Sequence, residues 1–267
     1  KRQIDYCVCC SSKNVEMFPA IIVPFLVARM TGQSLPVEVG VPGNYIHCLD
    51  CDFASTDLRF ERDEEIRYYQ NYMKEEYISH RCGYDGLGMR GLLEIYSGPE
   101  YKEIRVSEAT KIISEVLDCS MIKSVLDYGG DTGEMIPKNL DHAARYVTDV
   151  QLRELPNGVR AVQDPSECGT VDLVICGHTL EHVSYPRLVL EDMKRYMKSG
   201  TWLYLEVPNE RTAHVAGMVF HEHINRFNLE SLNRLLTEYG FVDLKGTHIA
   251  YSKWFAGNAY AVTGRLA

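Results

Sequence analysis

The sequence predicts an α/β fold with a doubly wound, mostly parallel sheet, preceded by a small cysteine-rich module. Helix-like and strand-like segments alternate over residues 105–267, and this alternation is typical of a parallel sheet with helices on both faces. The first strand-like run, "SVLDYGG", ends in glycines, and ligands bind such sheets just beyond the carboxyl ends of the strands. We therefore expect a cysteine module at 1–60, a helical, Tyr/Gly-rich connector at 61–104, and the sheet domain at 105–267.

The elements of the sheet domain follow from short apolar runs and amphipathic stretches. Strands are expected where apolar runs end in turn residues, at 124–130, 144–150, 158–164, 171–177, 201–210, 241–250 and 254–267. Helices are expected at 106–119, just after the fourth strand, at 186–200 and at 229–240. Ser107 is expected to cap the first helix, and Gly240 lies just past the last one. The two final strands are consecutive, which predicts an antiparallel hairpin.

Composition and charge exclude some classes of function. The 267 residues carry a net charge of −9, and Lys and Arg form no cluster, so duplex nucleic acid is not an expected partner. No apolar run approaches the ~20 residues of a membrane span, and no signal peptide is present, so we expect a cytoplasmic protein without a span. The first residue is not Met, so we expect that the chain is either trimmed or part of a longer polypeptide. A homo-oligomer is also left open.

Four of the nine cysteines form two C-x-x-C pairs, Cys7 with Cys10 and Cys48 with Cys51. Two such turns can clamp one Zn²⁺ ion between four thiolates, and without a secretory signal a disulfide framework is not expected. A zinc ion held by four thiolates has no open position, so its predicted role is structural. The alternative is that these are buried free thiols.

The connector contains tyrosines and glycines at high density. Ile66, Tyr69, Met73 and Tyr77 recur at helical spacing, which predicts one amphipathic helix. The rings either pack the joint between two domains or line a substrate cleft there. The following run, "GYDGLGMRGLLEIYSGPE", predicts a flexible loop or lid.

The glycine turn "VLDYGGDTG" has the wrong pattern for binding phosphate. It lacks the G-K-[ST] of a P-loop, and Gly129 and Gly130 are adjacent rather than one residue apart as in a dinucleotide fingerprint. Asp127, just before the glycines, would repel a pyrophosphate and would suit a cationic ligand.

This turn resembles the first motif of the class I S-adenosylmethionine-dependent methyltransferases, acid-x-G-x-G-x-G, with Asp131 at the position of the middle glycine. The resemblance covers residues ~105–267 and implies a seven-stranded sheet that binds S-adenosylmethionine. It implies the following roles in cofactor binding: Asp127 with the backbone of Gly129, Gly130 and Gly133 at the methionine end, Asp149 at the ribose hydroxyls, and Asp164 near the adenine. The segment "CGHTLEHV", with Cys176 and His178, resembles the fourth-strand segment that lies beside the transferred methyl group.

The segment "FHEHINRF" provides candidates for catalysis. His221, Glu222 and His223 are consecutive, which is not H-E-x-x-H, so a second metal is not expected. A histidine beside a carboxylate is a competent general base near neutral pH.

The whole arrangement is similar to the sugar C-methyltransferases that carry an N-terminal zinc module. This resemblance implies a nucleotide-linked sugar or a glycan as substrate, with His223, Glu222 and His182 in the active site. The family has a tyrosine where this chain has Phe220, and a phenylalanine has no hydroxyl to move a proton. Methylation of a sugar oxygen therefore stays open beside methylation of carbon. A non-catalytic protein, or one directed at protein or RNA, whose zinc module binds a partner, is the alternative.

Overall fold

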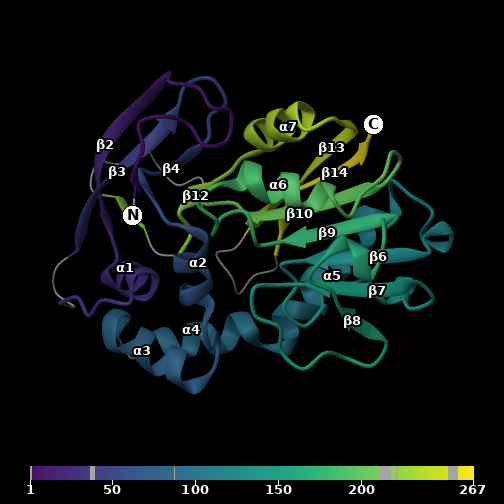
Figure 1. The fold of residues 1–267 in the computed structure, drawn as a ribbon, viewed down its shortest axis with the longest axis horizontal. Helices are drawn as coiled ribbons and strands as arrows, with labels where there is room; N and C mark the ends of the chain where they lie inside the picture. Colours follow the sequence, from purple (N-terminus) through teal and green to yellow (C-terminus); the bar gives the residue numbers. More distant parts are fainter. Residues whose placement is uncertain (1, 37–39, 87, 211–217, 221, 252–257) are drawn as a thin grey trace.

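The computed structural model describes residues 2–36, 40–86, 88–210, 218–220, 222–251 and 258–267. Two sheets lie side by side, the N-terminal one at the left of Figure 1 and the larger one at the right, with the connector helices below. Among these described residues, no helix has the length and apolar character to cross a membrane.

The larger sheet confirms the predicted fold. It has seven strands in the order β13-β14-β10-β9-β6-β7-β8, and only β14 runs antiparallel to its neighbours. The strands are β6 (Ser124–Tyr128), β7 (Ala144–Thr148), β8 (Val159–Ala161), β9 (Leu173–Gly177), β10 (Trp202–Pro208), β13 (Phe241–Ala250) and β14 (Asn258–Leu266). The sheet reverses its winding between β6 and β9, and ligands bind at such a switch point.

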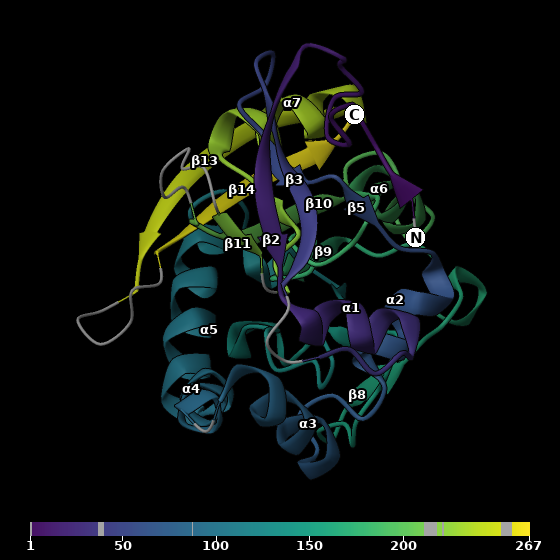
Figure 2. The same ribbon diagram turned by 90° about the vertical axis from the view of Figure 1, so that its left-hand side faces the viewer.

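Three helices cover this sheet, two on one face and one on the other (Figure 2). α6 (Pro186–Lys194) and α7 (Leu229–Glu238) pack in one apolar cluster, whereas α5 (Pro99–Ser114) packs in another. The cap predicted at Ser107 is wrong, because α5 begins at Pro99, whose fixed φ suits the first helical turn. The crossovers from β6 to β8 contain only turns and the short 3₁₀ helix η2 (Lys138–Leu140), and η1 (Cys119–Met121) and η3 (Pro165–Glu167) are similar single turns.

The N-terminal sheet is completed by the distant segment that carries the candidate catalytic residues. Its order is β11 (Met218–Phe220), β2 (Val15–Ile22), β3 (Val41–Cys48), β4 (Ala54–Thr56) and β12 (Asn225–Arg226). α1 (Pro24–Thr31) follows β2, and β1 (Arg2–Gln3) pairs with β5 (Leu58–Arg59). The expected boundary at residue 60 is thus crossed by hydrogen bonds, and residues 222–224 are held between strands of this sheet.

The connector is more helical than its composition predicts. It contains α2 (Arg62–Tyr69), α3 (Glu75–Asp85) and α4 (Gly88–Ser97), so the predicted single helix and the predicted glycine loop are both wrong. The helical spacing of Ile66, Tyr69, Met73 and Tyr77 is broken at Asn71 and Met73, whose positive φ angles separate α2 from α3. On α2, Tyr68 packs in the core and Ile66 is exposed. Most of the tyrosine rings pack against one another; Tyr72 also lines the cavity described below.

Candidate active site

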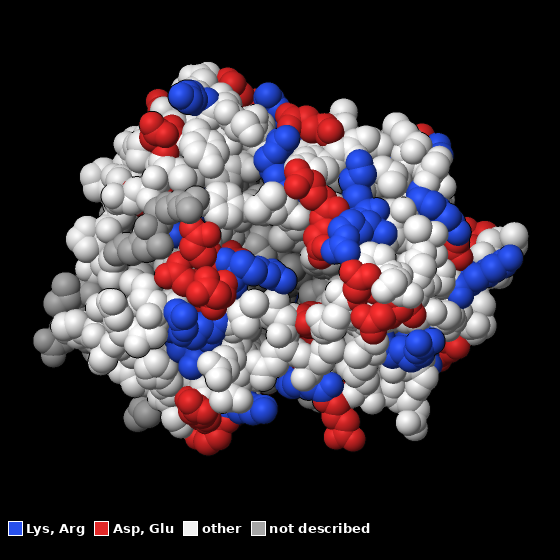
Figure 3. Space-filling view, in the orientation of Figure 1, with Lys and Arg blue, Asp and Glu red and all other residues white. Residues whose placement is uncertain are grey.

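A cavity of about 530 Å³ lies where the connector meets the carboxyl ends of the sheet strands. α3, α4 and α5 form one wall, and the turn after β6, the ends of β9 and β10 and residues 222–226 form the others. Charged side chains of both signs surround a recess near the middle of the molecular face in Figure 3. This position agrees with the expected binding edge of a doubly wound sheet.

The glycine turn brings main chain to the edge of this cavity. Gly129 has a φ of 71°, and a Cβ there would lie 2.4 Å from Thr179 Oγ1. A Cβ at Gly130 would lie 2.2 Å from Asp127 Cγ. Only glycine fits at both positions, because the first needs a left-handed backbone and the second has a side chain packed against it. Gly129 and Gly130 both line the cavity, and Gly133 also has a positive φ.

Asp127 is buried directly behind this turn. Its exposed fraction is 1%, and neither oxygen accepts a hydrogen bond of ordinary geometry from any residue the structure describes. Burial raises the pKa of Asp127 to about 7, although the guanidinium of Arg105 lowers it. An unpaired buried carboxylate is costly, and a cationic ligand group is the natural partner for it.

Asp149 stands at the end of β7, half-buried beside the same turn. Its two oxygens accept hydrogen bonds from the backbone N–H groups of Asp131 and Gln151, each at 3.0 Å. Burial raises the pKa of this carboxyl. Each oxygen keeps a further lone pair, so the carboxylate retains the capacity to accept hydroxyl donors.

Asp164 and Cys176, two further residues predicted for the cofactor site, have other contacts in the structure. Asp164 caps η3 by accepting from the backbone N–H of Ser166, and its other oxygen pairs with Arg195 at 2.7 Å. Cys176 is fully buried in the apolar core under β9. The described residues that line the cavity include Gly129, Gly130 and His178 but not Asp127, Gly133, Asp149, Asp164 or Cys176. Asp127, Gly133 and Asp149 still lie at the glycine turn, whereas Asp164 turns to solvent and Cys176 into the core.

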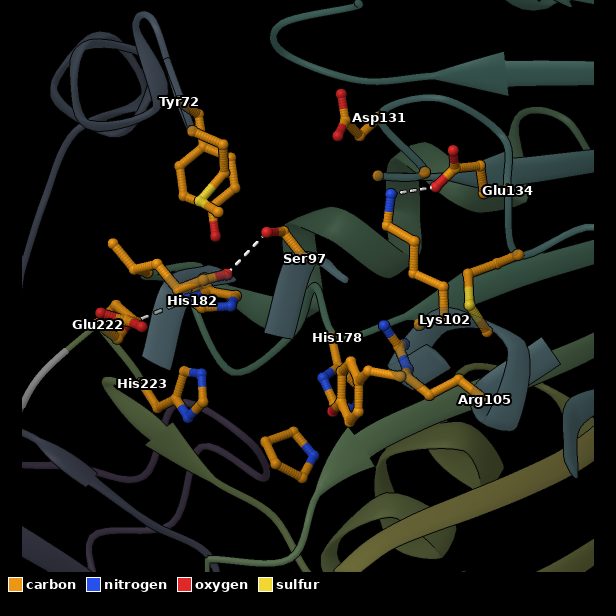
Figure 4. Close-up of a pocket in the computed structure, with 18 of the residues that line it drawn as sticks. Tyr72, Ser97, Lys102, Arg105, Asp131, Glu134, His178, His182, Glu222 and His223 are labelled. Atoms are coloured by element: carbon orange, nitrogen blue, oxygen red, sulfur yellow. Dashed lines mark hydrogen bonds and ion pairs between the residues drawn. The ribbon is translucent and has the colours of Figure 1, made fainter. Parts of the chain in front are cut away.

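Two histidines meet on one side of the cavity (Figure 4). The ring centroids of His182 and His223 are 4.7 Å apart, and the rings are nearly perpendicular. Glu181 lies beside them, with an exposed fraction of 1% and both carboxylate oxygens lacking a hydrogen-bond partner in the described part of the chain. Ligand-capable atoms of these three residues all lie within 4.8 Å of one another.

The sequence pairs His223 with the adjacent Glu222, but the structure gives each a different partner. His223 Nδ1 contacts Glu210 Oε1, and Glu222 pairs with Arg81. Burial lowers the pKa of His223, but the contact with Glu210 outweighs it and raises the pKa to about 9. His221 lies outside the described residues.

Next to Glu181, with one ring nitrogen 3.8 Å from its carboxylate, His178 belongs to a buried network around Glu206. Glu206 accepts hydrogen bonds from Arg105 Nε at 2.9 Å, Tyr204 Oη at 2.6 Å and Tyr251 Oη at 2.7 Å. His178 Nε2 lies 3.0 Å from the same carboxylate. Burial, reinforced by Arg105, lowers the pKa of His178 to about 4, so this ring is neutral at pH 7.

The residues that sequence reasoning missed are chiefly the acids Glu181, Glu206 and Glu210. Glu181 stands inside the quoted segment "LEHV", and Glu206 and Glu210 lie at or just after the carboxyl end of β10. The rule that ligands bind beyond strand ends also marks Glu210, because it ends the fifth expected strand.

The four predicted metal-ligating cysteines come together on the N-terminal module. Cys7 Sγ lies 3.7 Å from Cys51 Sγ, and Cys10 Sγ lies 3.6 Å from Cys48 Sγ. Four thiolates ~2.3 Å from a tetrahedral zinc ion are about 3.8 Å apart, so these residues fit the ion. Both C-x-x-C turns are closed by a residue with positive φ, Ser11 in one and Asp52 in the other. Cys9 is not one of the four, although its thiol interacts with those of Cys7 and Cys51 and also donates to the carbonyl of Ser231 in α7.

The chain is similar to one protein family and to several solved structures. Residues 101–245 match a family model described as a methyltransferase domain. A methyltransferase from Archaeoglobus fulgidus is similar in structure, with 17% identity, 64% of this chain and 96% of that chain covered, and a TM-score of 0.48. The plantazolicin methyltransferase BpumL has 13% identity, coverage of 68% and 91%, and a TM-score of 0.49. The N-terminal domain of EvdMO1, solved with SAH and D-fucose, has 16% identity, coverage of 61% and 83%, and a TM-score of 0.43. A comparison with curated protein sequences finds no match.

The family match spans more than half of the chain, from α5 to β13. The chain therefore belongs to the methyltransferase domain family. Its seven-stranded sheet with one antiparallel strand makes it a class I, S-adenosylmethionine-dependent methyltransferase.

Proposed function

We propose that this protein transfers a methyl group from S-adenosylmethionine to a sugar, either linked to a nucleotide or part of a glycan. The observation that carries the proposal is the unpaired, buried carboxylate of Asp127 behind a glycine turn, at a cavity whose other side carries paired histidines. The bound cofactor supplies an electrophilic methyl group on a sulfonium ion, and such a cationic ligand fits Asp127.

The cofactor-holding residues in this proposal form one edge of the sheet. Asp127 and the backbone at Gly129, Gly130 and Gly133 bind the methionine end, where the glycines permit close approach. Asp149 accepts hydrogen bonds from the ribose hydroxyls, using the lone pairs that its two hydrogen bonds from backbone N–H groups leave free. Asp164 and Cys176 are left out of this set, because the Asp164 carboxylate pairs with Arg195 and the Cys176 side chain is buried in the core.

The acceptor lies across the cavity from the glycine turn, against His182, His223 and Glu222. Its nucleophilic atom gains reactivity as it loses a proton. His223, with Glu210 holding its Nδ1 side, accepts that proton in its neutral form, and because its pKa is raised to about 9 this form increases as the pH rises toward 9. Glu222 is held by Arg81 and thereby fixes the backbone next to His223. Holding donor and acceptor in line supplies much of the rate in such a displacement.

The cavity lining supports a hydroxyl-rich acceptor. Hydrogen-bonding side chains from four different segments line it, namely Tyr72, Ser97, Asn209 and Asn258. The cationic side chains Lys102, Arg81, Arg105 and Arg153 all have carboxylate partners. A polar, largely neutralised lining is suited to sugar hydroxyls, which offer both donors and acceptors.

The test has two parts. Calorimetry with S-adenosylmethionine measures cofactor binding, with the exposed variant Asp164→Asn as a control that retains affinity. A screen of keto and hydroxy sugar nucleotides and free glycans with labelled methyl donor, followed by mapping of the labelled atom, identifies the acceptor and separates carbon from oxygen methylation. Absence of cofactor binding would leave the non-catalytic alternative, and label found in protein or RNA but in no sugar would contradict the proposed acceptor.

A further inference from the structure

We propose that Glu181, His182 and His223 bind a divalent transition-metal ion on the wall of the cavity, separate from the four-cysteine site. The coordination positions that these three residues leave open face the space proposed for the acceptor. This placement of the acceptor rests on the proposed function. Sequence spacing does not predict this site, because His221 and His223, two positions apart, lack the spacing of a metal motif. The ligands in the structure come instead from the turn after β9 and from the segment before β12.

The distances allow a shared ion. One ligand-capable atom of each residue lies within 4.8 Å of the others, and Glu181 Oε1 is 3.7 Å from His182 Nε2. Nitrogen and oxygen ligands bind such ions at ~2.0–2.2 Å, so small side-chain rotations bring all three into contact with one centre. His182 and His223 both line the cavity, which leaves the site open on that side.

The buried carboxylate of Glu181 is a second observation, independent of the distances, that points to a bound cation. Its carboxylate is buried, with an exposed fraction of 1%, and neither oxygen has a hydrogen-bond partner among the residues that are described. Burial of an acidic group without a partner is costly, and buried charges are normally paired or bound to metals. Glu181 Oε1 lies 3.7 Å from His182 Nε2 and 3.8 Å from His178 Nδ1, which is too far for hydrogen bonds.

Both ligand histidines are oriented by an acceptor on their far side. His182 Nδ1 lies 3.3 Å from the carbonyl oxygen of Glu222, and His223 Nδ1 contacts the carboxylate of Glu210. In the neutral ring, an N–H on Nδ1 leaves Nε2 with its lone pair free for a ligand bond, so an ion that binds there displaces any proton on Nε2. Metal-bound histidines regularly donate their other N–H to a carboxylate or a backbone carbonyl in this way.

The donor set points to the kind of ion. Two imidazoles and one carboxylate suit Zn²⁺, Fe²⁺, Co²⁺ or Mn²⁺ and leave coordination positions for other ligands. An ion here would bind an oxygen of the acceptor and lower that oxygen's pKa, so that its proton passes more readily to water. His223 would then act as a ligand rather than as a free proton acceptor, and methylation of oxygen would be favoured.

Mn²⁺ is the probe for this site, because it prefers nitrogen and oxygen ligands to the thiolates of the cysteine cluster. The 267-residue protein, as purified without chelators, is titrated with Mn²⁺, and the paramagnetic resonance signal of free Mn²⁺ reports binding. We expect one Mn²⁺ per chain, with affinity reduced at least about tenfold in Glu181→Gln and in His182→Gln. The exposed His248→Gln is the matched control and should retain binding.

Two outcomes overturn the proposal: no Mn²⁺ binding by the folded protein, or binding that both ligand variants retain. Circular dichroism establishes that each variant is folded, and His223→Gln provides a third variant if one does not fold. Calorimetry with S-adenosylmethionine on the same samples separates the two proposals. Cofactor binding without Mn²⁺ binding defeats the metal site alone, and Mn²⁺ binding without cofactor binding defeats the proposed function alone.

Discussion

His223 Nδ1 donates a hydrogen bond to Glu210 Oε1 at the cavity, although the two residues are 13 positions apart. Glu210 follows β10 of the large sheet, whereas His223 precedes β12 of the N-terminal sheet. The contact therefore joins the two sheets at the proposed site of methyl transfer. It also fixes the orientation of the imidazole, whether that ring accepts a proton or binds an ion.

Glu210→Gln tests this contact. The variant keeps the size of the side chain but removes the charge that orients His223, so we expect turnover to fall by about 10–100-fold. Cofactor affinity should change less than about twofold, because Glu210 contacts His223 and Arg226 rather than Asp127 or Asp149. Steady-state kinetics and calorimetry measure the two effects. Glu115→Gln, which alters an exposed acid paired with Lys245, is the control; equal losses in both variants would contradict the role of Glu210.

Asp127 makes cofactor affinity depend on pH. Burial raises its pKa to about 7, and only the ionised form attracts a cationic ligand. As pH falls below about 7, the free protein becomes protonated there, and we expect affinity for S-adenosylmethionine to fall by up to about tenfold per pH unit. Asp127→Asn should bind weakly at every pH. Calorimetry between pH 5.5 and about 7.5 measures this dependence, and a flat profile in the unsubstituted protein would disprove the assignment.

The same carboxylate should lower the stability of the free protein. In the unfolded chain Asp127 ionises near the ordinary aspartate pKa of 3.8, whereas in the folded protein it retains the proton up to about pH 7. The cost of the buried charge is absent at low pH, grows as pH rises between these values and is complete above about 7. Asp127→Asn is therefore expected to raise the free energy of unfolding by roughly 2–4 kcal/mol at pH 8, and by little at pH 4. Urea denaturation at both pH values gives the comparison, and a destabilised variant at pH 8 would refute the expected cost of this buried charge.

The cysteine cluster predicts about one tightly bound zinc ion per chain. Cys48→Ser should lose that zinc and unfold the N-terminal module, because the ion is the link between its two turns. Cys168→Ser, which changes a cysteine outside the cluster, should retain both zinc and fold. Metal analysis and near-ultraviolet circular dichroism provide the measurements. A metal-free sample with native spectra would exclude the four-thiolate site.

The sequence predicted those parts of the molecule that local chemistry determines. The central strands β6, β9 and β10 are short apolar runs bounded by turn residues, and the two C-x-x-C pairs are single turns of chain. The connector was mispredicted because α4 contains glycines that usually indicate loops, and its helix forms through packing against α3 and α5. The partners of His223 and Glu222 depend on tertiary contacts, which adjacency in the sequence does not reveal.

Arg81 provides the clearest test of how the connector supports the site. Its side chain is 3% exposed, pairs with Glu222 and Asp85, and donates to the hydroxyls of Tyr68 and Tyr77 at 3.3 Å. Arg81→Gln leaves the Glu222 carboxylate without its cation, so we expect a loss of about 3–5 kcal/mol in the free energy of unfolding and slower turnover. Adding Glu222→Gln removes the unpaired charge and should recover part of that stability.

A double-mutant cycle with urea denaturation measures this coupling. The exposed pair of Arg90 and Glu75 is the matched control, and solvent screening should make its coupling much smaller. The cycle should show strong coupling for the buried pair, because each partner is costly to bury alone. If the Arg81 and Glu222 substitutions prove additive, the ion pair does not hold residues 222–223 in place. The connector would then contribute packing to the cavity without positioning the catalytic segment.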